Sequence, residues 1–545
     1  IARQTEDPGG LSLQTHLHYD NNGNLVASVN PRGFWKEMSY DGRNRLVHIQ
    51  HEDGATNHIY YDELGRKIGT LDARGYAKAY GYDVRGRRVR ERTLMTAPAA
   101  PESLDASDFL TWGNPDLPRV AGDLYMDSEY TARSNLKQVT DAEGHTLSFT
   151  YDALSRLRSE RHPVSTVFDT ENGQRQEASY RWYAYGENSG SLSTGFQPTA
   201  SLDSRGYLSV IRYDTRYRPI AHAQKYQNPE DVSGEDEHWN PFAGSVSLPD
   251  LNTFGNRPPD YATTWTSYDQ VGNPLVKLDA KGIRHETEVD ALNRPVLHRT
   301  AVSQPGITDP FYGQQKTTYT STGLAWKIEE TRDGQTRITD HEFDAAGRKI
   351  LTRLPEVYDA LTDSRLRPTQ EVDLDANGNS HRSRDALGHE WETLFDARDR
   401  PLHRISPVVY DAEQQQWTRT LESTTYDLSG NPVEQTDARG FTTTNVYDAA
   451  HRLTHSLSPF VDLLQNGSSS VQRIVNEQIY SPNGNLLEHW QGTTTSDLSG
   501  YTRHRLVTKN EYNARNQLAE TAQDLNQDGI ITVDDTAVHN HYKRL

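Results

Sequence analysis

The sequence contains no cysteine, which excludes a disulfide framework and any metal site built on thiolates. No apolar run approaches the roughly 20 residues that span a bilayer as a helix, so we expect no membrane span. Basic residues are outnumbered 57 to 76, which leaves a net charge of −19. Because a nucleic-acid partner requires lysine and arginine to neutralise its phosphates, this charge balance argues against nucleic acid and against anionic membranes.

The chain also lacks an initiator methionine and a signal-peptide pattern, since it begins Ile1-Ala2-Arg3. We interpret it as an internal part of a longer protein. Only 34% of its residues are hydrophobic, which is close to the composition of disordered chains. The 29 tyrosines are regularly placed, however, and this regularity favours an ordered fold.

What the sequence does contain is a repeat in which a Tyr-Asp pair is followed by a glycine, a short stretch, an Asp-x-x-Gly turn and another short stretch. Successive tyrosines at steps of 21 residues are Tyr19, Tyr40, Tyr61 and Tyr82. The two glycines of one unit are 10 residues apart, as in Gly65 and Gly75. From Gly272 onward a larger unit of 51 to 55 residues is visible.

Each residue of the repeat has a physical reason to be there. An aspartate that opens a turn bonds the backbone two residues on, and glycine accepts the positive φ that closes it. The stretches between turns have the length and composition of half-exposed strands. The pattern therefore predicts an all-β fold, an antiparallel meander in which each tyrosine ring stacks on the tyrosine of the next unit.

The signature resembles the YD repeat of the Rhs family. Three stretches carry the resemblance best: 61–66 (Tyr-Asp-Glu-Leu-Gly-Arg), 151–156 (Tyr-Asp-Ala-Leu-Ser-Arg) and 343–348 (Phe-Asp-Ala-Ala-Gly-Arg). It covers about residues 12 to 520. The family includes bacterial Rhs polymorphic toxins, the B–C component of Tc insecticidal toxin complexes and the teneurins. The resemblance implies one long β-sheet that spirals into a hollow shell, which in bacterial members encloses a toxic polypeptide.

Six segments interrupt the repeat within the predicted shell region 1–523. They lie at about 96–123, 226–261, 302–314, 355–368, 407–417 and 460–471. Insertions at regular places in a repeat map to loops on one face or rim. We interpret them as spacer loops, with binding surfaces as the alternative.

A twelve-residue stretch near the end fits a calcium loop of the EF-hand or dockerin type within segment 524–545. Its oxygen ligands would come from Asp524, Asn526, Asp528, the Ile530 carbonyl, Thr532 and Asp535. Gly529 would allow the sharp turn, and residues 536–545 would form an exiting helix. We expect a structural Ca²⁺ here; the alternative is a solvated turn without metal.

No catalytic constellation emerges from the sequence, so we expect a protein that is not an enzyme. There is no His-Glu-x-x-His, no Gly-x-Ser-x-Gly and no phosphate-binding loop. The pairs His16/His18 and His539/His541 are typical of surface histidines rather than metal ligands, and Asp340 with Glu342 is a weak candidate for paired carboxylates. Residues 7–11 (Asp-Pro-Gly-Gly-Leu) match the self-cleavage string of Rhs proteins, but they precede the repeats, and we interpret them as a turn leading into the first strand.

We therefore expect a non-enzymatic shell of a secreted or surface-exposed bacterial Rhs-type protein that encloses a toxin or effector polypeptide. The alternative is an extracellular, calcium-stabilised adhesion protein that binds a protein or glycan through its insertions. Both hypotheses place the chain outside the cell or at its surface.

Overall fold

The computed structural model describes residues 2–6, 11–169, 173–186, 197–203, 205–226, 242, 248–301, 313–332, 334–412, 415–465, 468–524 and 537–539. Strands dominate throughout this part of the chain. A single α-helix, α1 (Ala106–Gly113), and two 3-10 turns, Pro101–Ser103 and Leu498–Gly500, accompany them within the described residues.

The strands of the first half follow one another at short intervals. They are β1 (Ala2–Glu6), β2 (Leu13–Tyr19), β3 (Leu25–Val29), β4 (Trp35–Tyr40), β5 (Leu46–Gln50), β6 (Thr56–Tyr61), β7 (Lys67–Leu71), β8 (Ala77–Tyr82), β9 (Arg88–Thr93), β10 (Leu124–Tyr130), β11 (Leu136–Thr140), β12 (Thr146–Tyr151), β13 (Leu157–Arg161), β14 (Ser165–Asp169), β15 (Gly173–Glu177), β16 (Tyr180–Ala184), β17 (Ala200–Asp203), β18 (Leu208–Tyr213), β19 (Pro219–Lys225), β20 (Tyr261–Tyr268), β21 (Pro274–Leu278) and β22 (Arg284–Val289).

The second half continues in the same way. Its strands are β23 (Pro295–Ala301), β24 (Gly313–Tyr319), β25 (Ala325–Arg332), β26 (Gln335–Phe343), β27 (Lys349–Arg353), β28 (Val357–Asp359), β29 (Ser364–Leu366), β30 (Thr369–Leu374), β31 (Ser380–Arg384), β32 (Glu390–Phe395), β33 (Pro401–Ile405), β34 (Val409–Asp411), β35 (Gln416–Thr418), β36 (Leu421–Tyr426), β37 (Pro432–Thr436), β38 (Thr442–Tyr447), β39 (Leu453–Gln465), β40 (Ser468–Tyr480), β41 (Leu486–Thr494), β42 (Thr502–Tyr512), β43 (Leu518–Gln523) and β44 (Ala537–His539).

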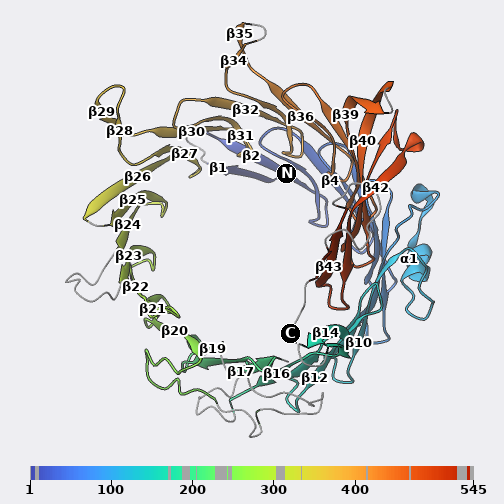
Figure 1. The fold of residues 1–545 in the computed structure, drawn as a ribbon, viewed down its shortest axis with the longest axis horizontal. Coiled ribbons are helices and arrows are strands. Elements are labelled where there is room, and N and C mark those ends of the chain that lie inside the picture. Colours follow the sequence, from blue (N-terminus) through green and yellow to red (C-terminus); the bar gives the residue numbers. More distant parts are fainter. Residues whose placement is uncertain are drawn as a thin grey trace.

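These strands form the predicted antiparallel meander. Thirty-eight of them belong to one sheet, a 38-stranded sheet in which each strand pairs with the next member along the chain. The sheet curls into a ring, and after one circuit the strands from β30 onward lie against those near the N-terminus (Figure 1). We call the strands from β1 to β27 the first circuit and those from β30 to β44 the second circuit. Within the described residues no strand pairing joins β1 to β44.

Most insertions stand on the outside of this ring. Helix α1 and the two-stranded hairpins β28–β29 and β34–β35 lie outside it in Figure 1. Residues 460–471 extend β39 and β40 into one long hairpin, whose pairing continues to Gln465 and Ser468. The insertion at 302–314 lies almost wholly outside the described residues.

One apolar core forms where the insertion at 96–123 covers β6–β9. Phe109 of α1 is fully buried and stacks on Tyr60 with ring centroids 4.2 Å apart. Gly69 is required beneath it, because a Cβ at this position would come within 1.9 Å of the Phe109 ring. Asp105 caps the helix by accepting a hydrogen bond from Ser107 N–H at 2.7 Å. This insertion is therefore a packed cover and not a spacer loop.

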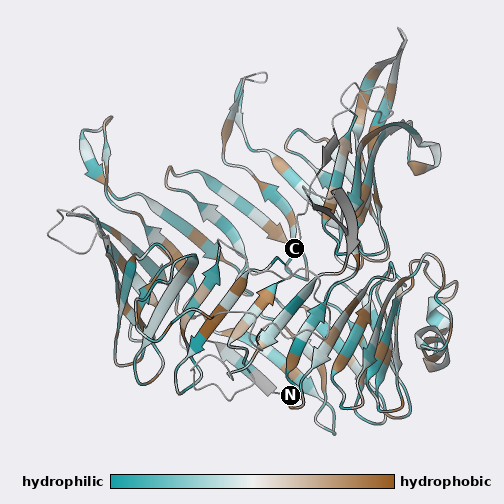
Figure 2. Cartoon of the chain, turned by 60° about the horizontal axis from the view of Figure 1, so that its bottom comes forward, coloured by the Kyte–Doolittle hydropathy of each residue, from teal (hydrophilic) through white to brown (hydrophobic). Residues whose placement is uncertain are grey.

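A second apolar core forms beneath the insertion at 226–261. Its sheet side is provided by Trp182, Leu202, Leu208, Val210 and Trp265, and the insertion adds Phe242 and Leu251. Elsewhere apolar and polar residues alternate along the strands and do not gather into a common layer (Figure 2). Stability therefore comes from local covers and from the turns that join the strands.

The turns contain the positive φ angles that the repeat predicts, for example Gly65 at φ 85°. Tyr217 occupies the equivalent position at φ 61° although its side chain is 49% exposed and finds little packing there. A side chain with a Cβ costs roughly 1–2 kcal/mol in this region, whereas glycine adds about 0.4–1 kcal/mol of unfolded-state entropy. We expect Tyr217→Gly to raise the local free energy of unfolding by up to about 1 kcal/mol, measured by hydrogen exchange of β18 and β19.

Two glycines serve as a matched pair for that experiment. Gly65→Ala is expected to lower the local free energy of unfolding by about 1 kcal/mol, because its φ is positive. Gly42 has no positive φ, and nothing lies within 4 Å of the place that a Cβ would take, so Gly42→Ala is expected to be neutral or slightly stabilising. Equal effects at Gly65 and Gly42 would contradict the explanation from backbone conformation.

Two expectations about the chain ends are wrong. A strand, β1, precedes residues 7–11 and pairs with β2, so this string does not lead into the first strand. Residues 537–539 form β44, which pairs with β43, where we expected an exiting helix. In both places the edge of the sheet offers unpaired backbone groups, and an adjacent segment of chain satisfies them.

Candidate functional site: the seam and the inner face

The Tyr-Asp turns are organised by their aspartates. Asp41 Oδ1 accepts hydrogen bonds from the backbone N–H groups of Arg43 at 2.9 Å and Arg45 at 3.0 Å. Its Oδ2 accepts from the Arg45 Nε at 2.7 Å, and Arg45 Nη1 continues to the carbonyl of Asp62 at 3.0 Å. Each arginine thus ties its own turn to the following one. The predicted turn geometry is confirmed.

The predicted stacking of tyrosine on tyrosine is wrong. The ring of Tyr61 lies under the Arg45 guanidinium, 4.6 Å from its centroid. The same relation recurs along the chain in Arg66–Tyr82, Arg87–Tyr130, Arg156–Tyr185, Arg218–Tyr268, Arg294–Tyr319, Arg400–Tyr426 and Arg452–Tyr480. Tyrosines of neighbouring units such as Tyr40 and Tyr61 lie two strands apart, about 9–10 Å, which is too far for ring stacking. The long arginine side chain spans the gap between the tyrosines of alternate strands.

These turns make the fold sensitive to acid. The side-chain hydrogen bond from Arg45 and its backbone N–H lower the pKa of Asp41 from 3.8 to about 2. Hydrogen bonds from Asn24 likewise lower the pKa of Asp20, and those from Arg87 lower that of Asp83. A carboxylate with a lowered folded pKa stabilises the fold fully above its unfolded pKa, and this contribution is lost as the pH falls through the folded value.

We therefore expect stability to fall between about pH 4 and pH 2, as the turn carboxylates become protonated. Far-UV circular dichroism during thermal unfolding at each pH measures this. An Asp41→Asn variant, which has no carboxylate to protonate at that turn, should show a smaller pH dependence than the unaltered chain. A constant melting temperature over this interval would contradict the expectation.

The two circuits meet along a line that we call the seam. On the first circuit it consists of the turns 30–33, 51–54, 72–75 and 141–144, and on the second circuit of the turns 375–378, 396–399, 427–430, 448–451 and 481–484. Hydrogen bonds join residues 342 to 377 positions apart across it. The seam is therefore the set of contacts between the first and the second circuit.

Charges alternate along the seam and are complementary across it. Arg32 donates from Nη1 to the Asp396 carbonyl and to Asp399 Oδ1, both at 2.7 Å, and its Nε lies 3.3 Å from Asp375. At the next turn of the first circuit, 51–54, the charges are exchanged. Here the first circuit provides the carboxylate of Asp53, which forms ion pairs with Arg398 at 2.8 Å and Arg400 at 3.0 Å on the second circuit.

The alternation continues at the next two turns of the first circuit. Arg74 donates to the Asp448 carbonyl at 3.0 Å and lies 3.7 Å from Asp427. Asp141 then accepts from the side-chain amide of Asn483 at 2.7 Å. The side chains of Arg32, Arg74, Asp53 and Arg398 are only 12–19% exposed, with Arg74 the least and Asp53 the most exposed. Because the pairs form a half-buried network, they are worth more than isolated surface ion pairs.

The strand registers decide which side chains face inward. Helix α1 lies outside the ring and packs on Gly69, so residues that share its face of the sheet are outward and their sequence neighbours inward. Carboxylates on the strands of the second half lie mostly on the outer face: Glu286, Glu288, Glu329, Asp340, Glu342, Glu371, Asp373, Glu390, Glu392, Glu434, Glu477 and Glu488.

The inner face is lined mainly by uncharged polar side chains. Its members in the same region include Thr266, Thr287, Thr300, Gln315, Thr317, Thr339, Thr352, Gln370, Ser383, Thr393, Thr424, Gln435, Thr443, Asn445, Ser456, Asn476 and Gln478. The carboxylates of Glu91, Glu160, Asp203, Glu330 and Glu422 are the inward exceptions on the main-sheet strands from β2 to β43.

Several histidines also belong to the inner face. Burial lowers the pKa of His222, His341 and His489, and burial together with the neighbouring His285 lowers that of His298. These imidazoles are therefore neutral at pH 7. The inner face therefore presents hydroxyl, amide and neutral imidazole groups. These groups can form hydrogen bonds with a polypeptide without burying large apolar surfaces against it.

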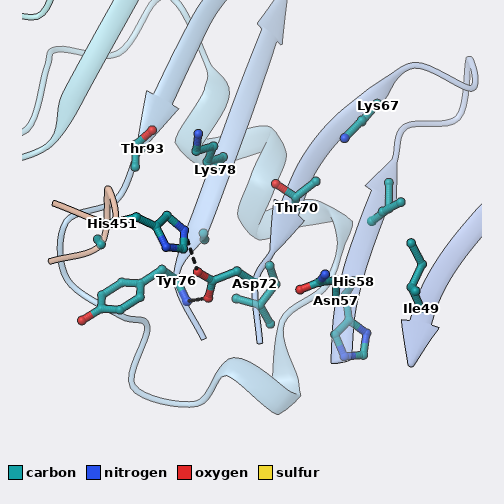
Figure 3. Close-up of a pocket in the computed structure, with 14 residues that line it drawn as sticks. Ile49, Asn57, His58, Lys67, Thr70, Asp72, Tyr76, Lys78, Thr93 and His451 are labelled. Carbon is teal, nitrogen blue, oxygen red and sulfur yellow. Dashed lines mark hydrogen bonds and ion pairs between the residues drawn. The ribbon is translucent and has the colours of Figure 1, made fainter. Parts of the chain in front are cut away.

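A pocket of about 290 Å³ opens on the inner face where β5–β9 meet the seam. Figure 3 shows Lys67, Thr70, Lys78 and Thr93 along one side of it. On the opposite side His451 of the second circuit reaches Asp72, with Nε2 and Oδ2 3.8 Å apart. Both circuits thus contribute to the pocket.

Most of the predicted calcium loop lies outside the described residues, namely Asn526, Asp528, Ile530, Thr532 and Asp535. Asp524 is described; it follows β43 and is buried, with 7% of its surface exposed. His16 and His18 lie on the same face of β2, and the described residues contain no group of three or more histidine and carboxylate side chains placed to hold a metal.

The weak carboxylate candidate is engaged by arginines. Asp340 accepts from Arg367 at 2.7 Å, and Glu342 pairs with Arg353. No helix in the described part of the chain is long and apolar enough to cross a membrane.

The seam residues were missed by sequence reasoning. Turn 51–54 differs from its neighbours because it has aspartate where turns 30–33 and 72–75 have arginine. This change from a positive to a negative side chain at the same turn position was the feature of the sequence that could have indicated the seam. The partners lie more than 340 positions away, and the length of one circuit cannot be obtained from the repeat.

Comparison with known proteins agrees with this architecture. The RHS Repeat family matches residues 130–167 and 426–459. No curated protein matches the chain. Among solved structures, the chain is similar to the Tc holotoxin pore of Photorhabdus luminescens with a mutation in TccC3, at 11% identity and a TM-score of 0.50, covering 94% of this chain and 30% of that one. The complex TcdB2-TccC3-Cdc42 matches at 12% identity and a TM-score of 0.45, covering 96% of this chain and 33% of that one.

The chain therefore spans about a third of the length of these solved chains. The likeness to the holotoxin pore concerns the fold alone. The two matches to the RHS Repeat family, together with the Tyr-Asp repeat that recurs through most of the sequence, show that the chain contains RHS repeats.

Proposed function

We propose that this chain is part of a non-enzymatic shell that encloses a toxin or effector polypeptide in a secreted or surface-exposed protein. The observation that carries the proposal is the sidedness of the ring. The helix, the hairpins and both apolar cores belong to the outer face, whereas the inner face is polar and mostly uncharged. Such a wall suits a polypeptide that must be stored and later released.

Electron microscopy of the full-length protein tests this proposal. We expect a closed shell with density inside it, and a protease should degrade the enclosed polypeptide only after the shell has been opened. An Asp53→Arg variant, which weakens the seam, serves as the opened form in the same assay. A shell without internal density, or contents degraded equally in both forms, would contradict enclosure.

A second candidate function is binding of an external protein or glycan through the outward hairpins. Hairpins β28–β29 and β34–β35 repeat the triplet Val-Tyr-Asp, at 357–359 and 409–411. Their aromatic side chains are exposed: Tyr358 by 62%, Tyr410 by 53% and Trp417 by 70%. Tyr410 and Trp417 pack edge to face with ring centroids 5.5 Å apart. Exposed aromatic pairs of this kind are typical of interaction surfaces.

The hairpin tips allow a clean test because they lie away from both cores. The double variant Tyr410→Ser and Trp417→Ser should abolish cell or glycan-array binding if the hairpins bind, while the melting temperature stays unchanged. Leu361, which is 97% exposed on the neighbouring hairpin, supplies a control as Leu361→Ser. Unaltered binding by the double variant would exclude this role.

We further propose that segment 524–535 binds Ca²⁺ in a structural role, supported by the ligand pattern and by the burial of Asp524. Millimolar Ca²⁺ is then expected to raise the melting temperature of the chain, and this increase should be absent in an Asp528→Ala variant. Mg²⁺ at the same concentration serves as the control cation. An equal shift with both cations, or the same Ca²⁺ shift in the variant, would contradict the site.

A further inference from the structure

We propose that the pocket at the seam is a docking site for an acidic segment of the enclosed polypeptide, in which an aliphatic or aromatic residue is followed by carboxylates. This inference rests on the proposed enclosure, because the pocket opens on the inner face. It adds to that proposal the place at which the contents are held and the chemistry that selects them.

Positive charge in the pocket exceeds negative charge. Lys67 and Lys78 belong to its lining, and no ion pair within the described residues engages Lys78. Asp72 is the acidic member, and it is already occupied: it accepts from the backbone N–H groups of Arg74 at 3.0 Å and Tyr76 at 2.8 Å and lies beside His451. A visiting carboxylate would therefore find the Lys78 ammonium without an ion-pair partner among the described residues, whereas Lys67 also lies within the electrostatic influence of Glu91 on the same inner face.

Hydroxyl groups lie beside these lysines. In the sheet Lys78 is directly opposite Thr70 on one side and Thr93 on the other, so the three side chains share the inner face. Figure 3 shows Lys67, Thr70, Lys78 and Thr93 along the same side of the pocket. Ammonium and hydroxyl donors in one row can bind the two oxygens of a carboxylate.

The remaining lining combines the polar residues Asn57 and His58 and the aromatic Tyr76 with an apolar group. Its apolar side chains are those of Ile49, Ile59 and Ala449, whereas Leu71 and Ala77, which also border the pocket, belong to the core beneath helix α1. A volume of about 290 Å³ accommodates a side chain of the size of leucine or phenylalanine with part of its backbone. The combination of an apolar surface with a cationic row selects a peptide that has both features rather than an isolated anion.

The pocket is complete only when the ring is closed. Ala449 and His451 come from the second circuit, whereas the lysines and threonines come from the first. A segment that binds both circuits stabilises the closed state by mass action. The contents of the shell would then reinforce the seam, and their departure would weaken it.

Fluorescence anisotropy with labelled five-residue peptides, acetylated and amidated, tests the proposal on the chain 1–545. We expect Gly-Leu-Glu-Glu-Gly to bind about tenfold more tightly than Gly-Leu-Gln-Gln-Gly, as two half-buried charge contacts would give. Lys78→Gln and Lys67→Gln should each reduce this preference. Lys316→Gln is the control, since Lys316 is exposed on the outer face.

Equal affinity for the two peptides, or an unchanged preference in both lysine variants, would overturn the docking site. Equal displacement of the acidic peptide by inorganic phosphate and by unlabelled peptide would also overturn it, since the pocket would then bind anions without selecting a polypeptide. The peptide assay uses the chain 1–545 alone, whereas enclosure is judged from internal density in the full-length protein. A failure of one is therefore distinguishable from a failure of the other.

Discussion

Replacement of Asp53 by arginine is expected to open the ring. In the closed form the Asp53 carboxylate receives Arg398 at 2.8 Å and Arg400 at 3.0 Å, and both partners are at most 20% exposed. Arginine at this position would place three cations together in a half-buried site, at a cost of about 3 kcal/mol or more. The radius of gyration from small-angle scattering should rise, and amides of turns 51–54 and 396–399 should exchange faster.

The matched control is Asp373→Arg, because the Asp373–Arg382 pair is 3.8 Å long and about half exposed on the outer face, with side-chain exposures of 58% and 47%. It should leave the scattering curve unchanged. The double variant Asp53→Arg and Arg398→Asp exchanges the charges across the seam and should recover part of the closed form. A radius of gyration unaffected by Asp53→Arg would show that the seam charges do not hold the ring.

Truncation of Phe109 to alanine is the second large effect that we expect. This aromatic side chain is fully buried between α1 and the strands, stacks on Tyr60, and packs on Trp112 with centroids 5.0 Å apart. Its removal leaves a cavity above Gly69, and comparable truncations of buried phenylalanine cost about 3–5 kcal/mol. Hydrogen exchange should show increased opening of α1 and of β6–β9, whereas β20–β23 should be unaffected.

Leu110 is the control on the same helix, because its side chain is 49% exposed. Leu110→Ala should change the local stability by less than about 1 kcal/mol. If both truncations had the same effect, the helix would not be held by the side chain of Phe109. Local measurement is necessary in both experiments, since repeat sheets open in parts and not in a single transition.

The local structure of this protein follows from its sequence. Asp41 and its equivalents select one turn geometry through hydrogen bonds within five residues, and Gly65 and its equivalents supply the φ angle that the turn requires. Strand length and order follow from turns at fixed spacing, so the antiparallel meander was predictable. The outward hairpins at 355–368 and 407–417 were visible as interruptions of the repeat, although their exposure on one side of the sheet was not.

Contacts between distant residues were not predictable in the same way. The tyrosine rings are covered by arginines because alternate strands lie too far apart for ring stacking. The distance between alternate strands cannot be obtained from the residue pattern. The helix α1 lies in a segment that we expected to be a loop, where a capping box of Asp105 and Asp108 and the buried Phe109 stabilise it against the sheet.

The sequence by itself determined the repeat, the turns and the meander, because these depend on interactions within about 20 residues. Only the tertiary structure decided where the sheet meets itself, which face looks inward and which turns form the seam. The physical reason is that the curvature of the ring accumulates from small rotations between many adjacent strands. A slight change in each rotation would move the contact of Arg32 with Asp399, 367 positions away, to a different turn.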